Sequence, residues 1–222
     1  MKRETQSSAL LVFVRSTHRG KVKTRLARSL GDDKATEFYK LCTDAVLEEI
    51  RQLSPEVEKY ISFAEPISEY EMRRLAGLEF MVSVQEGKNL GQRLCSTFSK
   101  ALQSGARKVV VVASDVPDLS KKIMEEAVSR LDNSDVVMGP CYDGGYYLIG
   151  MKDLHEELFN GISWGTEQVY RQTLDAAKEN GLTVEQLPIL NDIDTEADLR
   201  RWSQLDGPKK PALMGFIKTI RL

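Results

Sequence analysis

Short apolar runs alternate along this chain with longer segments whose apolar residues recur at helical spacing. The run Ala9–Val14 is apolar at every position and is followed at once by charge, which is typical of a strand buried on both faces. The run Lys108–Ala113 is the strongest strand candidate of the same kind. Further strands are predicted at Val57–Ala64, Phe80–Val84, Asp135–Gly139, Tyr146–Met151 and Thr183–Leu187.

Amphipathic segments separate these strands. A mostly apolar stripe that includes Ala35, Phe38, Cys42 and Ala45 predicts a long helix over Asp33–Leu53. Because strands and helices alternate, the sequence predicts an α/β fold with a mostly parallel sheet and helices on both faces. The other predicted helices are Glu69–Leu75, Leu90–Ser104, one capped by Ser120, Thr166–Asn180 and one capped by Thr195.

A chain of 222 residues suits one α/β domain, so we expect residues 1–222 to form a single domain with 207–222 as a C-terminal tail. The tail mixes Lys209, Lys210, Lys218 and Arg221 with apolar residues. Such a segment fits a membrane-surface or partner-binding helix, or a segment folded against its own domain. We favour the second interpretation because the basic face is small.

Charge and hydropathy exclude several classes of partner. The chain has 31 basic and 33 acidic residues and a formal charge of −2, so no overall field attracts it to nucleic acid. Apolar runs such as Ala9–Val14 are far shorter than the ~20 residues of a membrane helix and too short for a signal-peptide core. We therefore expect a cytoplasmic protein without membrane insertion, and the sequence leaves a homo-oligomer open.

Cysteine and histidine are scarce and scattered. Cys42, Cys95 and Cys141 are far apart, and His18 and His155 are the two histidines. This pattern argues against a disulfide framework or a structural zinc site. Any metal should be held by oxygen atoms, which favours Mg²⁺ or Mn²⁺.

A basic segment follows the first predicted strand, where a parallel sheet binds its ligands. Gly20 allows the backbone to turn close to a ligand, and Lys21, Lys23 and Arg25 are suited to surround a diphosphate. The segment lacks the G-x-x-x-x-G-K-[ST] pattern of a P-loop. A solvated basic loop is an equally good interpretation from composition alone.

Two carboxylate-bearing segments are candidates for a metal site. Asp115 comes just after the strongest strand, where a cation that bridges phosphates needs a carboxylate, while Asp118 or Ser120 is suited to cap the next helix. Asp192 and Asp194 alternate, so on a strand they would share a face. The alternative for this second segment is a simple helix start.

The segment Asp143–Tyr146 places two glycines beside a carboxylate, which lets a small polar ligand approach the backbone. By itself Asp-Gly more often forms a hairpin turn. Gln85, Gly87 and Arg93 lie in a strand-to-helix connection that suits a nucleotide, or serves as a connection alone. Trp164 offers a stacking ring, although a tryptophan before a helix is more often packing.

Six ordered motifs extend over about Leu10 to Trp202. They are G-x-x-K-T-R-L (Gly20 to Leu26), Gln-Glu-Gly…Leu-Gly-x-Arg (Gln85 to Arg93), Ser-Asp-x-Pro-Asp-Leu (Ser114 to Leu119), Gly-Pro-x-x-Asp-Gly-Gly-Tyr-Tyr-Leu-Ile-Gly (Gly139 to Gly150), Trp-Gly-Thr (Trp164 to Thr166) and Asp-Ile-Asp-Thr…Asp-Leu (Asp192 to Leu199). On these motifs the chain resembles the glycosyltransferase-A-like family of radical-SAM/selenodomain-associated transferases (DUF2064-type), some of them linked to arsenosugar biosynthesis. That family is similar to phospholactate and molybdenum cofactor guanylyltransferases and to CMP-sugar synthetases.

The resemblance implies a nucleotide-diphospho-sugar transferase fold of the GT-A, Rossmann-like type, and a role for each motif. The implied metal ligands are Asp115, Asp194 and Asp192. The implied nucleotide and phosphate contacts are Arg15, Gly20, Lys23, Arg25, Gln85, Gly87, Arg93 and Ser114. The implied contacts to the acceptor or transferred sugar are Asp143, Gly144, Gly145, Tyr146, Trp164 and Thr166. The chain departs from the family where Arg15-Ser16-Thr17 replaces the usual Lys-x-Pro, which keeps the charge but loses the rigidity of proline.

Three functional hypotheses follow. In the first, the protein is a metal-dependent glycosyltransferase that moves a sugar from a nucleotide-diphosphate sugar to a small-molecule acceptor. Lys23, Arg25 and the metal would stabilise the leaving diphosphate, and Asp143 would orient or deprotonate the acceptor hydroxyl. In the second, it transfers a nucleotidyl group from a nucleoside triphosphate and releases pyrophosphate. In the third, it binds nucleotide without turnover, which the retention of every candidate carboxylate disfavours.

Overall fold

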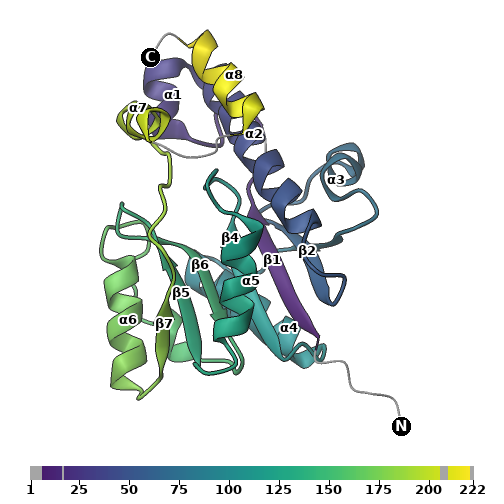
Figure 1. Cartoon of the computed structure of the whole chain (residues 1–222), viewed down its shortest axis with the longest axis vertical. Coiled ribbons are helices and arrows are strands. Elements are labelled where there is room, and N and C mark those ends of the chain that lie inside the picture. Colours follow the sequence, from purple (N-terminus) through teal and green to yellow (C-terminus); the bar gives the residue numbers. More distant parts are fainter. Residues whose placement is uncertain (1–6, 17, 206–209, 221–222) are drawn as a thin grey trace.

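The computed structural model describes residues 7–16, 18–205 and 210–220. Within these residues, a seven-stranded sheet forms the centre of the molecule (Figure 1). Each of the predicted strands is present, with ends shifted by at most a few residues. The strands are β1 (Ser8–Val14), β2 (Val57–Phe63), β3 (Met81–Val84), β4 (Lys108–Ala113), β5 (Val136–Pro140), β6 (Tyr146–Met151) and β7 (Val184–Gln186).

The strands are ordered β3-β2-β1-β4-β6-β5-β7. Every neighbouring pair is parallel except the two pairs that contain β6, which runs antiparallel to β4 and β5. The predicted mostly parallel sheet is therefore confirmed. Because β6 is reversed, its first residue, Tyr146, lies at the same edge of the sheet as the last residues of β1 and β4.

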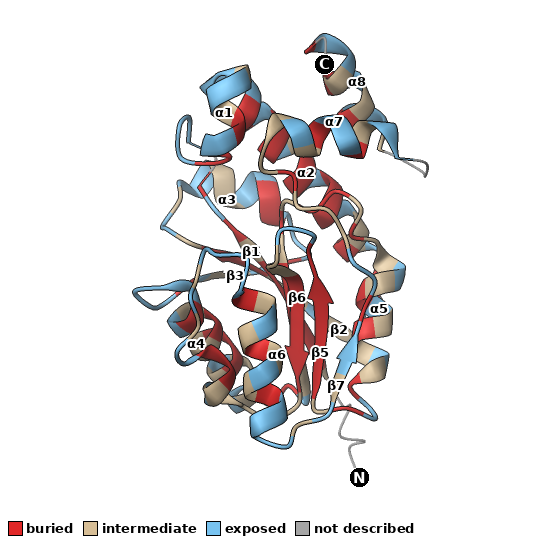
Figure 2. Cartoon of the chain, turned by 90° about the vertical axis from the view of Figure 1, so that its left-hand side faces the viewer, coloured by how far each residue is buried: buried red, intermediate tan, exposed pale blue. Residues whose placement is uncertain are grey.

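Helices cover both faces of the sheet, as predicted. Alternate residues of β1 point to opposite faces, so Leu10 and Val12 join one buried cluster while Ala9 and Leu11 join the other. Figure 2 shows that the strands in the middle of the sheet are buried. The first face is covered by α2 (Asp32–Arg51), α3 (Glu69–Ala76) and α5 (Lys121–Arg130), and the second by α4 (Leu90–Gln103), the 3₁₀ helix η1 (Glu156–Phe159) and α6 (Val169–Glu179).

Three short helices gather around the N-terminal half of α2, at one end of the molecule (Figure 1). They are α1 (Thr24–Leu30), α7 (Glu196–Gln204) and α8 (Pro211–Thr219). The ring of Phe216 in α8 lies 5.6 Å from that of Phe38 in α2. The described part of the C-terminal segment thus folds against the rest of the chain, which is the interpretation we favoured. Lys209 and Arg221 of this segment lie outside the described residues, and so does Thr17 in the basic segment.

Helix α1 was not predicted. It lies at the end of the basic segment and is only two turns long. Leu26 is its buried residue, so the apolar pattern is too short to predict a helix from the sequence. The predicted start of α6 at Thr166 is also early, since the helix begins at Val169. Thr166 lies in the preceding turn, where its hydroxyl donates to the carbonyl oxygen of Ser163. Among the described helices, none is both long and apolar enough to cross a membrane.

Candidate functional site

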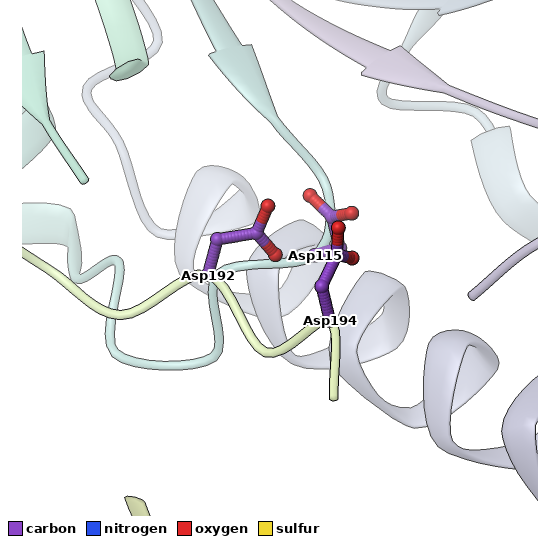
Figure 3. A group of neighbouring side chains, drawn as sticks. All are labelled: Asp115, Asp192 and Asp194. Atoms are coloured by element: carbon purple, nitrogen blue, oxygen red, sulfur yellow. The ribbon is translucent and has the colours of Figure 1, made fainter. Parts of the chain in front are cut away.

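Three aspartates and one lysine meet at the edge where β1 and β4 end. The carboxylates of Asp115, Asp192 and Asp194 converge (Figure 3), each with one oxygen within 4.8 Å of the others. The Nζ atom of Lys23 lies 2.9 Å from Asp115, 2.7 Å from Asp192 and 2.8 Å from Asp194. The Lys23 side chain is only 2% exposed. Sequence reasoning had selected all four residues, but not their direct contact.

Two loops bring the carboxylates together. Asp115 is the second residue after β4, and Asp192 and Asp194 precede α7. Thr195 and Asp198 form a capping box that fixes the start of α7. The indole of Trp202 in α7 donates to a carboxylate oxygen of Asp118 at 2.8 Å, which ties the two loops.

Lys23 has an unusual backbone. Its φ of 46° is the only positive φ of a non-glycine residue in the described part of the chain. This left-handed conformation costs an ordinary side chain roughly 1–2 kcal/mol. Lys23 stands immediately before α1 without a side-chain bond to the helix. Its ammonium group is turned instead to the three carboxylates, whose ion pairs offset the strain.

Electrostatic interactions shift the pKa values within this cluster in different directions. Burial by itself would lower the pKa of Lys23, but Asp115, Asp192 and Asp194 outweigh it and hold that pKa well above its usual range. Burial would raise the pKa of Asp115, and the ammonium of Lys23 reverses the shift to a net lowering. Burial and the charge of Asp115 raise the pKa of Asp192 despite Lys23. One ammonium therefore incompletely offsets three crowded carboxylates.

Tyr39 is a site residue that sequence reasoning missed. Its hydroxyl accepts the backbone N–H of Arg15 at 2.8 Å and lies 2.9 Å from the hydroxyl of Ser114. Burial, followed by the nearby charge of Asp115, raises the Tyr39 pKa, so the phenol keeps its proton, and either hydroxyl can be the donor in its hydrogen bond with Ser114. Tyr39 thus joins the ends of β1 and β4. The available signal was its position next to Phe38 on the helical stripe.

A first cavity of about 440 Å³ opens beside Asp115 and Asp192. Gln85 is buried there and donates to the backbone oxygen of Ser62 at 2.8 Å. Lys88, which sequence reasoning did not select, adds a positive charge. The implied nucleotide contacts that line this cavity are Arg15, Gln85, Arg93 and Ser114.

A second cavity, of about 660 Å³, lies beside Asp194 and Lys23. One oxygen of Asp143 accepts the backbone N–H of Gly145 at 2.9 Å, so the other oxygen is available to a ligand. Arg15 and Tyr146 line both cavities. The remaining expected residues on its wall are Arg25, Asp143, Gly145, Trp164 and Thr166.

Three expected glycines are absent from the described walls of both cavities and have structural roles. A β-carbon at Gly144 would lie 2.0 Å from the carbonyl oxygen of Glu167, so only glycine fits where this turn meets the start of α6. Gly87 has a φ of 145°, and a β-carbon there would approach the backbone nitrogen of Arg93 to 2.7 Å. Gly20 makes a turn with a φ of 75°.

A third cavity, of about 650 Å³, lies at the opposite edge of the sheet, beside Lys108 and Lys152. It contains none of the predicted site residues. Ligands of parallel α/β sheets bind at the carboxyl edge, which is where the first two cavities are. The candidate site is therefore the pair of cavities between which the three aspartates are divided, with Asp115 and Asp192 on the wall of the first and Asp194 on that of the second.

The chemistry of the donor set fits a divalent cation. Carboxylate oxygens are the ligands that Mg²⁺ and Mn²⁺ prefer, and three of them converge here. The ammonium of Lys23 now contacts the same oxygens and marks the position that a cation favours. The donors do not distinguish between the two metals.

Comparisons with solved structures define the class: an α/β fold shared with nucleotide-diphospho-sugar transferases and cytidylyltransferases. A proposed nucleotide-diphospho-sugar transferase from Desulfovibrio desulfuricans G20 is 31% identical, with a TM-score of 0.88 and coverage of 96% of this chain and 94% of that one. CMP:2-keto-3-deoxy-manno-octonic acid synthetase, solved with CTP, is 10% identical (TM-score 0.54; 88% and 96% covered). The inositol-1-phosphate CTP transferase of T. maritima is 14% identical (TM-score 0.54; 97% and 97% covered).

The chain belongs to the family described as "uncharacterized protein conserved in bacteria (DUF2064)", whose model matches residues 49–166. No curated protein matches its sequence. The relatives below 25% identity establish the fold alone.

Proposed function

We propose that this protein is a metal-dependent glycosyltransferase that moves a sugar from a nucleotide-diphosphate sugar to a small-molecule acceptor. One observation carries the proposal. Asp115, Asp192 and Asp194 stand where two cavities adjoin, with Asp115 and Asp192 lining the first and Asp194 the second. A transferase needs such an arrangement, because donor and acceptor must meet at the group that stabilises the leaving diphosphate.

The first cavity would hold the nucleotide. Gln85 presents a buried amide and Arg93 a guanidinium to a ligand there. The diphosphate would then lie toward Asp115, within reach of the cations Arg15 and Arg25. A bound Mg²⁺ or Mn²⁺ would withdraw charge from the leaving diphosphate.

The second cavity would hold the acceptor. The half-buried ring of Trp164 lies on the wall of this cavity, edge-on to the ring of Tyr146, with the ring centres 6.5 Å apart. Asp143 presents a carboxylate that is held in position by its bond to Gly145. In this proposal Asp143 orients the acceptor hydroxyl or takes its proton.

Nucleotidyl transfer from a nucleoside triphosphate is the alternative. It is favoured by the number of cations, because Lys21 and Arg25 line the second cavity in addition to Lys88 and Arg93 in the first. A triphosphate needs more positive charge than a sugar diphosphate. The shared fold of the two cytidylyltransferase-type structures also supports it.

A thermal-shift screen tests these proposals. Nucleotide sugars, nucleoside diphosphates and triphosphates are added with and without Mn²⁺ to the wild type, to Asp115→Asn, and to the matched control Asp153→Asn at the opposite edge of the sheet. We expect an Mn²⁺-dependent rise in Tm with one nucleotide-sugar series, since ligand at 100 times its Kd adds about 2.7 kcal/mol. The rise should be lost in Asp115→Asn and kept in the control.

Other results would change the assignment. A preference for a triphosphate would replace glycosyl transfer with nucleotidyl transfer. Metal-independent binding with no conversion of the nucleotide would indicate a binding protein, and no shift with any nucleotide would refute donor binding.

The variant Asp143→Asn tests the acceptor site. Asparagine keeps an oxygen that accepts the Gly145 N–H, so the turn should survive while the carboxylate is lost. We expect kcat to fall by about 10²–10⁴, the usual contribution of a general base, with unchanged nucleotide binding. Full turnover with the true acceptor would exclude Asp143 from this role.

A further inference from the structure

The ammonium group of Lys23 contacts all three aspartates, with hydrogen bonds to Asp192 and Asp194 and an ion pair with Asp115. It carries three N–H donors, and three carboxylate oxygens lie 2.7–2.9 Å from it. It is buried, and its backbone is held in the left-handed conformation. Lys23 is therefore bound to the acidic cluster as an ion would be.

This contact conflicts with both functions suggested for these residues. A divalent cation held by Asp115, Asp192 and Asp194 would stand close to the ammonium of Lys23, which already contacts one oxygen of each carboxylate. A phosphate held by Lys23 needs donors that the aspartates now occupy. The ammonium and a divalent cation repel each other at such a short distance, so both demands are met best when the ammonium leaves and the metal takes its place.

We propose that Lys23 is an internal cation that competes with the divalent metal for the three aspartates, so that metal uptake releases its ammonium group into the second cavity. Lys23 lines that cavity together with Arg25, so the freed group enters a region suited to an anion. The inference rests on the metal site of the proposed function and adds an exchange between two cations.

The exchange makes metal and anion binding mutually dependent. A metal that displaces Lys23 adds a positive charge to the second cavity, and an anion there stabilises the displaced ammonium. By linkage, each ligand then raises the affinity of the other by the same factor. The protein without ligands keeps its acidic cluster neutralised in part, which prevents three carboxylates from repelling one another.

Binding of Mn²⁺ alone, followed by electron paramagnetic resonance of the free ion, tests the competition. Lys23→Met removes the charge but keeps an unbranched side chain, and Lys178→Met is the control that removes an exposed charge from the last turn of α6, outside both cavities. We expect Lys23→Met to bind Mn²⁺ at least about tenfold more tightly than the wild type, because an ammonium at contact distance opposes a cation strongly. The control should bind like the wild type. Equal or weaker binding by Lys23→Met would overturn the proposal.

A second pair of variants covers the case in which Lys23→Met fails to fold. Asp192→Asn removes one of the three charges, and the comparison is then between Asp192→Asn and Asp192→Asn/Lys23→Met. The double variant should again bind Mn²⁺ more tightly, and no gain would refute the competition.

Release of the ammonium is measured in the wild type with an amine-acetylating reagent and mass spectrometry. We expect Lys23 to react more slowly than Lys21 without metal and to gain reactivity in step with Mn²⁺ occupancy. Continued protection of Lys23 with the site occupied would overturn the release. These experiments contain no nucleotide, so they test the exchange separately from the transferase. Exchange in a protein that binds no nucleotide in the thermal-shift screen would refute the transferase and keep the competition. Nucleotide binding without exchange would keep the transferase and refute the competition.

Discussion

Gly91 and Gly215 are both helical glycines, yet a β-carbon would meet different surroundings at each. At Gly91 in α4 it would lie 2.8 Å from the ring of Trp164 and 2.9 Å from the carbonyl oxygen of Phe159. At Gly215 in α8 it would meet no described heavy atom within 4 Å. The ring of Trp164 therefore requires glycine at position 91. The described surroundings of position 215 leave room for a larger residue.

The pair makes a matched test. Gly215→Ala should stabilise the protein by roughly 0.5–1 kcal/mol, because alanine is the better helix former. Gly91→Ala should destabilise it by about 1–3 kcal/mol despite the same gain, because the new methyl group must displace Trp164 or the backbone. Urea unfolding of both variants measures the difference, and a Gly91→Ala protein as stable as the wild type would contradict the packing described here.

Among the elements, α2 is joined to two other helices through Glu49. One carboxylate oxygen of Glu49 accepts a hydrogen bond of 2.6 Å from the Nζ of Lys210, the residue before α8. The other oxygen accepts a hydrogen bond of 2.8 Å from the backbone N–H of Lys121, the first residue of α5. Burial would raise the pKa of Glu49, but the bond to Lys210 and the bond to Lys121 outweigh it and lower that pKa below its usual 4.5. The ionised form is therefore stabilised by folding.

Glu49→Gln should cost about 1 kcal/mol of unfolding free energy at neutral pH, the scale of a charge-assisted bond that is partly exposed. Because the folded pKa is lower than the unfolded one, this stabilisation is complete above pH ~4.5 and is lost as the pH falls through the folded pKa. The difference between wild type and variant should therefore shrink in acid. Urea unfolding at neutral and acidic pH measures it, with the exposed Glu56→Gln as control, and a pH-independent difference would contradict the ionic contribution.

At the scale of the whole molecule, the candidate metal site is assembled from two segments far apart in sequence. Asp115 comes from the loop after β4, while Asp192 and Asp194 come from the segment before α7. The bond from Trp202 to Asp118 joins these segments, and Trp202 is buried in the cluster formed by α1, α2, α7 and α8. Helix α7 thus helps to position the carboxylates through a contact outside the three aspartates themselves.

Trp202→Phe should destabilise the protein by about 2–3 kcal/mol through lost volume and a lost bond. It should also weaken Mn²⁺ binding by about tenfold, because the lost bond to Asp118 joins the loop that carries Asp115 to α7. Phe98→Leu, a buried change in α4 on the other face, is the control for destabilisation alone. Equal Mn²⁺ affinity in the two variants would show that Trp202 does not position the site.

Much of this protein follows from its sequence. The apolar runs of β1 and β4 predicted buried parallel strands, because few other elements bury every residue of a short segment. The order of strands and helices then predicted which loops share the carboxyl edge of the sheet. Asp115 was selected on this basis, and Asp192 and Asp194 by their alternation, each together with the family resemblance; the structure brings the three carboxylates together.

Tertiary structure decided what local pattern does not encode. Helix α1 has too few apolar positions to be seen in the sequence, and Tyr39 and Trp202 act through partners that are distant along the chain. Above all, Lys23 reads as a phosphate ligand in a basic segment, yet its ammonium lies among three aspartates. The position of a long charged side chain depends on the net charge of every group around it, and that sum exists only once the two carboxylate loops have folded against it.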